Sequence, residues 1–468
     1  MSDVETYLGD RHDEILADLM ALARIPSVST DPAFAGGIRA GAEWVAAKMR
    51  AVGLDGVAVR ETGGHPCVTG HWLHAAGAPT ILIYGHYDVQ PADPVEKWVT
   101  PAFEPTVRDG RLYARGVSDD KGPMLIPLWV AQAFLATEGR LPINVKFLIE
   151  GEEEVGSAHL PSFVEHHAAE LEADFVLSAD GAMWRADLPT ATVASRGMCT
   201  VEATLTGAVK DLHSGRHGGS APNPLAGLAR LVATLHDPTG AVAVAGFHDG
   251  IIPIGNAGRI GLAGIPFDER AYLDEIGAAG PGGEDGLPLL ERQWTRPTLE
   301  LNGLWGGYTG PGSKTVIPSE AHVKISCRLV PGQEPAAVQQ AIRHHLEAHC
   351  PPSFRLAVTL PDHLSRAYAI RDDHPALALA EDILEEVLGR RPLRVRMGAT
   401  IPIGETFERV LGIDTVFFSF STADEDYHAP NEFFRLSSLA NGLVAWTRYW
   451  QRLGRQPRAE RPISPSIA

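Results

Sequence analysis

Apolar residues in the first 200 positions fall in runs of strand length that are separated by helical patterns. Three such runs are TILIYG at 80–85, NVKFLIE at 144–150 and FVLSAD at 175–180, and an apolar helical stretch at 124–136 lies between the first two. Strand-length runs that alternate with helical segments are typical of α/β domains. We therefore expect the chain to begin with an α/β domain.

The N-terminal segment has apolar residues at helical spacing. Leu8, Ile15, Leu16, Leu19 and Met20 lie among acidic residues, and this pattern predicts an amphipathic helix that packs on the core. It is not the basic-then-apolar pattern of a secretory signal.

From Gly197 onward the pattern changes to strict alternation. Cys199, Val201, Ala203 and Leu205 alternate with more polar positions, as in a sheet with one buried face. A second domain is expected to start here, with helices at 223–236 and 334–349, strands at 321–330 and 354–360, and a Gly- and acid-rich loop at 277–288. The last strand–helix–strand succession is βαβ-like.

The α/β pattern returns after about residue 366. It predicts a helix at 374–388, a buried strand at 415–420 and a closing helix at 436–453. The second domain is therefore expected to be inserted into the first, with residues 198–365 interrupting a discontinuous domain of residues 1–197 and 366–468.

Length, charge and cysteine content narrow the class of protein. The 468 residues suit two domains, and 40 Lys and Arg against 58 Asp and Glu give a formal charge of −18, which repels nucleic acid and anionic lipid. Four cysteines without a CxxC pair indicate neither a disulfide framework nor a structural zinc site. The most apolar stretch is shorter than the ~20 residues of a membrane span. We expect a soluble, cytoplasmic protein with no nucleic-acid or membrane partner.

Side chains of metal-binding types follow the apolar runs. Ligand sites in open α/β sheets lie at the carboxyl ends of the strands, so side chains at these ends are expected to meet. Each one alone has an ordinary reading, since most histidines are structural and glutamate runs are usually solvated faces. The candidates are His86 and Asp88 after the first run, Glu152, Glu153 and Glu154 after the second, Asp180 at the end of the third, His428 after the strand at 415–420, and Asp119 with Asp120 before the apolar helix.

Spacing within these groups suggests how they divide their work. His86 and Asp88 are two apart, so on a strand they share a face, where the carboxylate can accept the second ring N–H of a metal-bound histidine. Adjacent Glu153 and Glu154 diverge, so that one can bind a metal while the other faces a substrate. The alternative for His86 and Asp88 is a polar pair that merely ends a strand.

Three long motifs resemble a known family. GHYDVQP at 85–91, WVTPAFEPTVRDGRLYARGVSDDKGP at 98–123 and EGEEEVGS at 150–157 are similar to central motifs of the co-catalytic di-zinc metallopeptidases, which include cytosolic nonspecific dipeptidase, carnosinase, aminoacylase and succinyl-diaminopimelate desuccinylase. The resemblance covers nearly the whole chain and is strongest to the dipeptidase branch. It implies an α/β, di-zinc exopeptidase-like catalytic domain with a central mixed sheet, interrupted by an inserted α+β, ferredoxin-like lid and dimerisation domain.

The resemblance implies a role for each candidate at the sheet edge. Two metal ions per chain, most simply zinc with manganese or cobalt as alternatives, would be neutralised by three carboxylates and one bridging hydroxide. Glu153 would be the general base, Asp88 would support a ligand, Glu152 has no assigned role, and the Asp119–Asp120 peptide would be cis. The implied ligands are His86 and Asp180 for one metal, Glu154 and His428 for the other, and Asp119 as the bridge.

The inserted domain contains further implied site residues. DLHSG at 211–215 is similar to a dipeptidase motif whose histidine, here His213, reaches into the partner's active site in a homodimer to stabilise the oxyanion. Arg328 and Thr315 would bind the C-terminal carboxylate of the substrate, although Arg328 can also be read as a surface arginine. His363 and Thr400 are weaker matches near the same pocket.

One departure leaves the substrate open. At RMGATIP, 396–402, Met397, Gly398 and Ala399 replace an acidic residue and two glycines of the dipeptidases, and a carboxylate there would hold a free α-amino group.

The leading interpretation is hydrolysis of dipeptides or similar short peptides by a di-zinc-bound hydroxide with a Glu base. The runner-up is an amidohydrolase of N-acyl or N-carbamoyl amino acids. A catalytically inactive binding protein is disfavoured because every metal position is filled, and a glycosidase would not explain the spaced histidines.

Overall fold

The computed structural model describes residues 2–362, 364–398 and 402–456. The chain forms two compact units: the first comprises residues 1–193, 370–395 and 406–468, and the second comprises residues 194–369 and 396–405. The second unit is thus inserted in the sequence of the first. No helix among the described residues is both long and apolar enough to cross a lipid bilayer.

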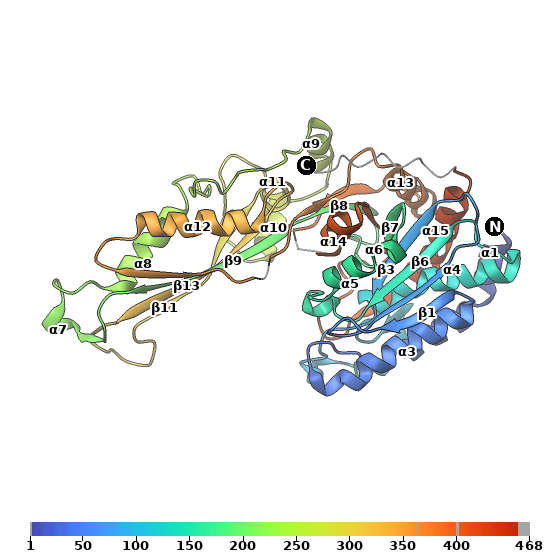
Figure 1. The fold of residues 1–468 in the computed structure, drawn as a ribbon, viewed down its shortest axis with the longest axis horizontal. Coiled ribbons are helices and arrows are strands. Elements are labelled where there is room, and N and C mark those ends of the chain that lie inside the picture. Colours follow the sequence, from blue (N-terminus) through green and yellow to red (C-terminus); the bar gives the residue numbers. More distant parts are fainter. Residues whose placement is uncertain (1, 363, 399–401, 457–468) are drawn as a thin grey trace. The chain divides into compact units, whose positions relative to one another are not determined.

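A six-stranded mixed sheet forms the centre of the first unit (Figure 1). Its order is β1-β2-β6-β3-β7-β17. Strands β6, β3, β7 and β17 are mutually parallel, whereas β2 pairs antiparallel with both β1 and β6. The central strands are buried on both faces, which explains their continuous apolar runs. The strands are β1 (Asp55–Arg60), β2 (Cys67–Trp72), β3 (Thr80–His86), β6 (Asn144–Glu150), β7 (Phe175–Ser178) and β17 (Thr415–Phe417).

Helices surround this sheet. The apolar helix between β3 and β6 is α4 (Gly122–Glu138), in which every residue from Gly122 to Phe134 is buried except Gln132. The predicted N-terminal helix is in fact two helices, because the chain breaks at Arg11 between α1 (Asp3–Asp10) and α2 (His12–Ala23). The other helices of this unit are α3 (Ala35–Val52), α5 (Leu160–His166), α6 (Ala168–Leu171), α13 (Pro375–Leu388) and α15 (Leu436–Leu453), and α14 (Pro402–Leu411) begins in the second unit's segment.

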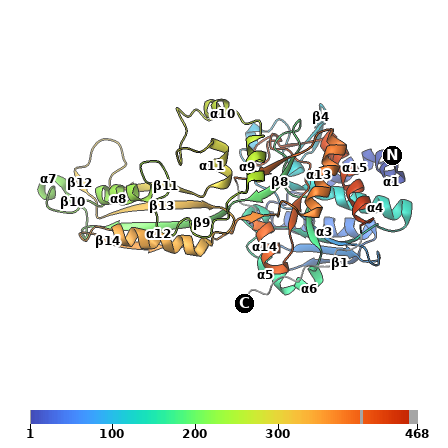
Figure 2. The same ribbon diagram turned by 90° about the horizontal axis from the view of Figure 1, so that it is seen from above.

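The second unit has a four-stranded antiparallel sheet of order β11-β13-β9-β14. Its strands are β9 (Gly197–Thr206), β11 (Thr298–Gly306), β13 (Glu320–Leu329) and β14 (Arg355–Thr359), with α8 (Pro224–Val232) after β9 and α12 (Pro335–His349) after β13. Two split βαβ units in this order form the expected ferredoxin-like arrangement. Figure 2 shows both helices running along the sheet.

Alternation in the sequence places one face of this second sheet in a core. Cys199, Val201, Ala203 and Leu205 of β9 are all buried together with apolar residues of α8 and α12. The predicted helix at 223–236 is shorter, because α8 ends at Val232 and a 3-10 turn, Ala233–Leu235, follows. The strand predicted at 415–420 is also shorter, since β17 ends at Phe417.

Short elements complete the two units. The first unit has a three-stranded sheet of β4 (Thr106–Arg108), β5 (Arg111–Tyr113) and β18 (Phe433–Arg435). The second unit has β10 (Leu212–His213) paired with β12 (Val316–Ile317), and helices α7 (Ser214–His217), α9 (Asn256–Ala263), α10 (Glu269–Glu275) and α11 (Leu289–Thr295). Strands β8 (Thr190–Ser195), β15 (Tyr368–Ala369) and β16 (Leu393–Arg396) lie where the chain passes from one unit to the other.

Candidate metal centre

The four parallel strands of the first sheet end at one edge, and each either ends in a metal-binding side chain or is followed by one. His86 is the last residue of β3, Glu154 follows β6, Asp180 follows β7 and His428 lies in the loop after β17. Asp119 approaches the same edge from the turn Val117–Lys121, which precedes α4. The topology therefore brings five residues together that are up to 342 positions apart in the chain.

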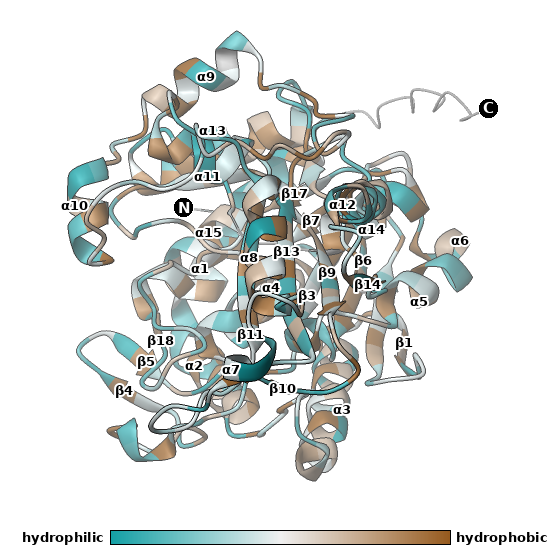
Figure 3. Ribbon diagram, turned by 90° about the vertical axis from the view of Figure 1, so that its left-hand side faces the viewer, coloured by the Kyte–Doolittle hydropathy of each residue, from teal (hydrophilic) through white to brown (hydrophobic). Residues whose placement is uncertain are grey.

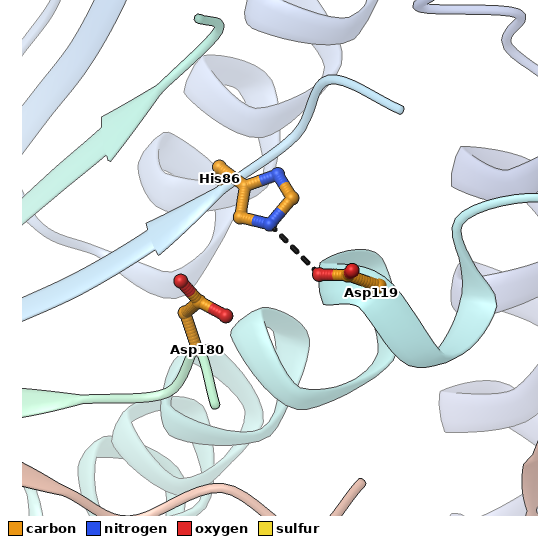
Figure 4. Close-up of side chains that lie close together, drawn as sticks. All are labelled: His86, Asp119 and Asp180. Carbon is orange, nitrogen blue, oxygen red and sulfur yellow. Dashed lines mark hydrogen bonds and ion pairs between the residues drawn. The ribbon is translucent and has the colours of Figure 1, made fainter. Parts of the chain in front are cut away.

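The first group consists of His86, Asp119 and Asp180 (Figure 4). Each offers one ligand atom, and these atoms all lie within 4.8 Å of one another. The Nε2 atom of His86 is 3.1 Å from Oδ1 of Asp119. His86 is completely buried, so its ring is held by packing as well as by its polar neighbours.

The second group consists of Asp119, Glu154 and His428, whose ligand atoms also lie within 4.8 Å of one another. The Nε2 atom of His428 is 3.0 Å from Oδ2 of Asp119 and 3.0 Å from Oε2 of Glu154. Asp119 thus presents one carboxylate oxygen to each group. This is the geometry expected of a carboxylate that bridges two cations.

The two histidines lie in a strongly negative environment. Burial by itself lowers the pKa of His86, but hydrogen bonds to Asp119 and Asp88 outweigh burial and raise that pKa well above its ordinary value. The hydrogen bonds of His428 to Asp119 and Glu154 raise its pKa to about 10. Both imidazoles are therefore placed where positive charge is strongly favoured.

The carboxyl groups show the complementary effect. Burial raises the pKa of Glu153 well above its ordinary value, and burial raises the pKa of Asp180 to about 6. Several carboxylates thus share a site in which they cannot all be ionised without positive charge beside them. Two divalent cations would supply that charge, and a mixed His and carboxylate donor set suits Zn²⁺, Mn²⁺ and Co²⁺. The residues fit a pair of divalent cations that share Asp119.

Asp88 contacts His86, as its spacing suggested, and it has a further role. The ring Nδ1 of His86 is 3.1 Å from the main-chain oxygen of Asp88 and 3.3 Å from its carboxylate. That carboxylate also accepts hydrogen bonds from the backbone N–H groups of Glu153 and Glu154, at 3.3 and 3.1 Å. Asp88 therefore orients a histidine and the two-glutamate turn at the same time.

The three consecutive glutamates point to different surroundings. The carboxylate of Glu152 is 3.0 Å from Nδ1 of His159, and it lies so close to Gly64 that a Cβ built there would meet Oε1 at 1.8 Å. Glu154 joins the second ligand group and accepts a hydrogen bond from Gln90 at 2.9 Å. Glu153 is influenced by the charges of His86, Asp180 and Asp119. Glu152 contacts His159 and no ligand group, and the role of Glu153 as the base stays a prediction.

Further residues support the ligands, and of these the sequence singled out Asp120 alone. Gln90 fixes Glu154, and Asp120 accepts a hydrogen bond from the backbone N–H of His86 at 3.2 Å. The Asp119–Asp120 peptide bond is cis, as the resemblance implied. Glu425 and Glu432, on either side of His428, are fully buried. Their signal in the sequence is weak, because they are two acids in an otherwise irregular loop.

The remaining predicted site residues belong to the second unit or lie outside the described residues. His213 is exposed at the end of β10, where its Nδ1 accepts a hydrogen bond from the N–H of Gly215 at 3.0 Å. Thr315 is exposed, and its main-chain oxygen accepts a hydrogen bond from Ser214 at 3.0 Å. Arg328 is half-buried on β13. Their roles stay predictions, and His363 and Thr400 lie outside the described residues.

Comparisons with known proteins agree with this geometry. Residues 82–452 match the model of Peptidase family M20/M25/M40. The chain is 31% identical over 383 residues to the Beta-Ala-His dipeptidase of Mus musculus, covering 81% of this chain and 78% of that protein. It is 29% identical over 459 residues to the Cys-Gly metallodipeptidase dug1 of Schizosaccharomyces pombe, covering 95% of this chain and 96% of that protein.

A solved structure shares the architecture. The M20 family metallo-carboxypeptidase Sso-CP2 from Sulfolobus solfataricus has a TM-score of 0.81 and 28% identity, with 94% of this chain and 99% of that chain covered. The fold and the site thus define a metal-dependent peptidase. The chain belongs to Peptidase family M20/M25/M40, and its activity depends on divalent metal ions.

Proposed function

We propose that the protein hydrolyses the amide bond of dipeptides or similar short peptides, with two divalent metal ions and Glu153 as the general base. The observation that carries this proposal is the shared carboxylate of Asp119 between two ligand groups, with Glu153 beside them. Among the described residues, no donor forms a hydrogen bond to the Glu153 side chain, so its carboxylate is available to a water molecule or a substrate.

The residues around the centre divide the proton transfers. When bound, the cations acidify a water molecule and polarise the scissile carbonyl. Glu153 accepts the proton of that water at its carboxylate and delivers it to the departing amine. Asp88 holds Glu153 in place through its backbone N–H.

The substrate class follows from the second unit and from the relatives. A half-buried arginine such as Arg328 suits the C-terminal carboxylate of a short peptide. Two relatives are named dipeptidases and one a metallo-carboxypeptidase, and both activities release a residue that carries a free carboxylate. Met397, in place of the acidic residue of the dipeptidase branch, favours the second candidate, an amidohydrolase of N-acyl or N-carbamoyl amino acids.

We also propose a homodimer in which His213 acts in the partner's active site. The edge strand β11 supports this assembly, because it pairs with β13 on one side and carries exposed Leu301, Leu304 and Trp305. An exposed apolar edge strand favours pairing with another chain. The segment that carries His213 is polar, and α7, which follows it, is hydrophilic (Figure 3).

Zinc is the metal we propose, because all five ligands are His or carboxylate.

A substrate screen tests this function. Purified protein with measured metal content is assayed against Ala-containing dipeptides and against N-acetyl amino acids. Preference for the dipeptides supports the leading proposal, preference for the acylated compounds supports the second candidate, and turnover of neither would contradict both.

A pair of isosteric variants tests the base. Glu153→Gln keeps size and shape but accepts no proton, so kcat should fall by roughly 10²- to 10⁴-fold while the metal content persists. Glu152→Gln is the matched control and should keep most activity, because Glu152 faces His159. The opposite result would show that Glu152, and not Glu153, is the general base.

A further inference from the structure

A buried glutamate lies behind the bridging ligand. Glu432 is completely buried and accepts four hydrogen bonds, three of them from backbone N–H groups. One carboxylate oxygen accepts from Gly116 at 2.7 Å, and the other accepts from Ser118 at 2.9 Å and from Asp119 at 3.2 Å. The backbone that presents the Asp119 side chain is therefore fixed by a residue only four positions after His428.

Arg115 completes this arrangement. Its side chain is 1% exposed, and its Nη1 donates to Glu432 at 2.7 Å. Its Nη2 donates to the main-chain oxygen of Ala429 at 3.3 Å, and its Nε donates to that of Pro91 at 3.2 Å. One guanidinium thus contacts the residue after His428 and the loop that follows His86 and Asp88.

Arg115 and Glu432, here called the clamp, therefore join three chain segments that carry ligands. The segments are 86–91, 115–119 and 428–432, and none of the metal ligands themselves belongs to the clamp. A second buried glutamate reinforces the same turn, since Glu425 accepts from the hydroxyl of Ser118 at 2.6 Å. Buried charges with this many satisfied hydrogen bonds specify one geometry, and removing one partner leaves the other unpaired.

We propose that Arg115 and Glu432 are positioning residues that set the spacing between Asp119 and His428. They thereby determine how tightly the second ligand group, which contains both of these residues, binds its metal ion. This inference rests on the proposed two-metal centre. The two groups should respond differently. His86 and Asp180 are fixed at or next to the ends of β3 and β7, whereas His428 lies in a loop, has a positive φ of 63° and is 48% exposed. The group of Asp119, Glu154 and His428 depends more on the clamp.

The test is a stepwise titration of metal-free protein with Zn²⁺ in the presence of a competing chelator. For Glu432→Gln, we expect the second equivalent to bind about 10- to 100-fold more weakly, the usual effect of losing a partner that orients ligands, and the first to change by less than about threefold. Arg115→Lys keeps a cation near Glu432 but cannot reach two carbonyls with a rigid fork, so it should give a smaller loss at the same equivalent.

Glu381→Gln is the matched control. Glu381 is a buried glutamate of α13, 3% exposed, that accepts hydrogen bonds from Arg391 and Arg394 at 3.1 Å each and contacts no ligand segment. Its loss should lower the thermal stability as the loss of Glu432 does, but leave both metal affinities unchanged. Circular dichroism of the metal-free variants verifies folding, and if Glu432→Gln does not fold, Arg115→Lys decides.

The outcomes separate the two proposals. Wild-type protein that binds two ions while both clamp variants bind them with unchanged affinity would overturn the clamp and leave the metal centre standing. Equal weakening in Glu432→Gln and Glu381→Gln would also overturn it, since the effect would then be general stability. Wild-type protein that binds one ion or none would overturn the two-metal centre itself.

Discussion

The two units treat buried charge in opposite ways. In the first unit, His86, Asp88, Asp120 and Glu150 are all within 1% of complete burial at one edge of the sheet. In the second unit, the buried charged or histidine side chains among the described residues are Arg196 and His345. The first sheet carries ionisable groups into its interior, while the second buries apolar side chains on one face.

This difference shows where each unit can contribute to catalysis. Burying several carboxylates together costs free energy unless positive charge compensates them, so their presence in the first unit marks a site built for cations. The second unit does not bear the free-energy cost of buried carboxylates in its described residues. Its predicted site residues, His213, Thr315 and Arg328, are exposed or half-buried. Its contribution is therefore expected to be substrate contact. Four predictions test this division.

The largest effect is expected for Asp119→Ala in the first unit. The variant loses the carboxylate that both ligand groups share, so at least one metal ion should be lost per chain. Activity should fall at least about 10³-fold, because several kcal/mol of transition-state stabilisation disappear and each 1.36 kcal/mol is tenfold. Metal analysis and kcat/KM on the same sample check this.

Asp10→Ala is the control for that experiment, because Asp10 is an exposed residue at the end of α1. It should keep both ions and full activity. An Asp119→Ala protein with two ions and normal activity would show that Asp119 is not the bridge.

The division into units also explains which features could be predicted from sequence. Apolar runs located β3, β6 and β7, and strict alternation located β9, because burial on two faces or on one face leaves a direct pattern. Two of the edge strands leave less of a pattern. β1 and β11 are largely exposed or half-buried, and the sequence did not reveal them.

Other features depend on contacts that no local pattern records. Helix α3 contains several glycines, which disfavour helices, yet Gly37 and Gly41 are required because a Cβ would meet Pro26 at 2.1 Å and Tyr87 at 2.9 Å. The ligands at the sheet edge could be predicted, since they follow strands. The clamp could not, because Glu432 is recognised by backbone N–H groups more than 300 positions away.

The next largest effect is expected for His213→Ala in the second unit. Loss of one oxyanion donor costs about 10²- to 10³-fold in kcat, and the metal content should not change. If His213 acts in the partner's site, a heterodimer of His213→Ala and Glu153→Gln chains has one site with both defects and one intact site. Purified heterodimer should then recover about half of the wild-type activity per dimer.

Both parental homodimers are the controls for that experiment, and each should be nearly inactive. A heterodimer as inactive as its parents would place His213 in its own chain's site. A fully active monomer would remove the need for a partner altogether.

Removal of metal is expected to have a smaller, localised effect on stability. Ligands at 100 times their Kd stabilise a protein by about 2.7 kcal/mol, which corresponds to a shift of about 5–10 °C for a unit of this size. A chelator should therefore lower the transition temperature of the first unit and leave that of the second unit unchanged. Calorimetry with and without the chelator measures both transitions. A common shift of both transitions would show that the units do not unfold independently.

The smallest effect is expected for Arg328→Lys, which keeps the charge but loses the two-pronged donor. A lysine replaces bidentate binding of a carboxylate by a single contact, so KM should rise about tenfold, equivalent to about 1.4 kcal/mol, with kcat within about twofold. The substrate itself provides the decisive comparison. The increase should appear with a dipeptide that has a free C-terminal carboxylate and be absent with its C-terminal amide, because the amide offers no anion to bind. Arg355→Lys on β14 of the same sheet is the matched control and should behave as wild type. If the amide is affected as much as the free acid, Arg328 supports the sheet and another residue recognises the carboxylate.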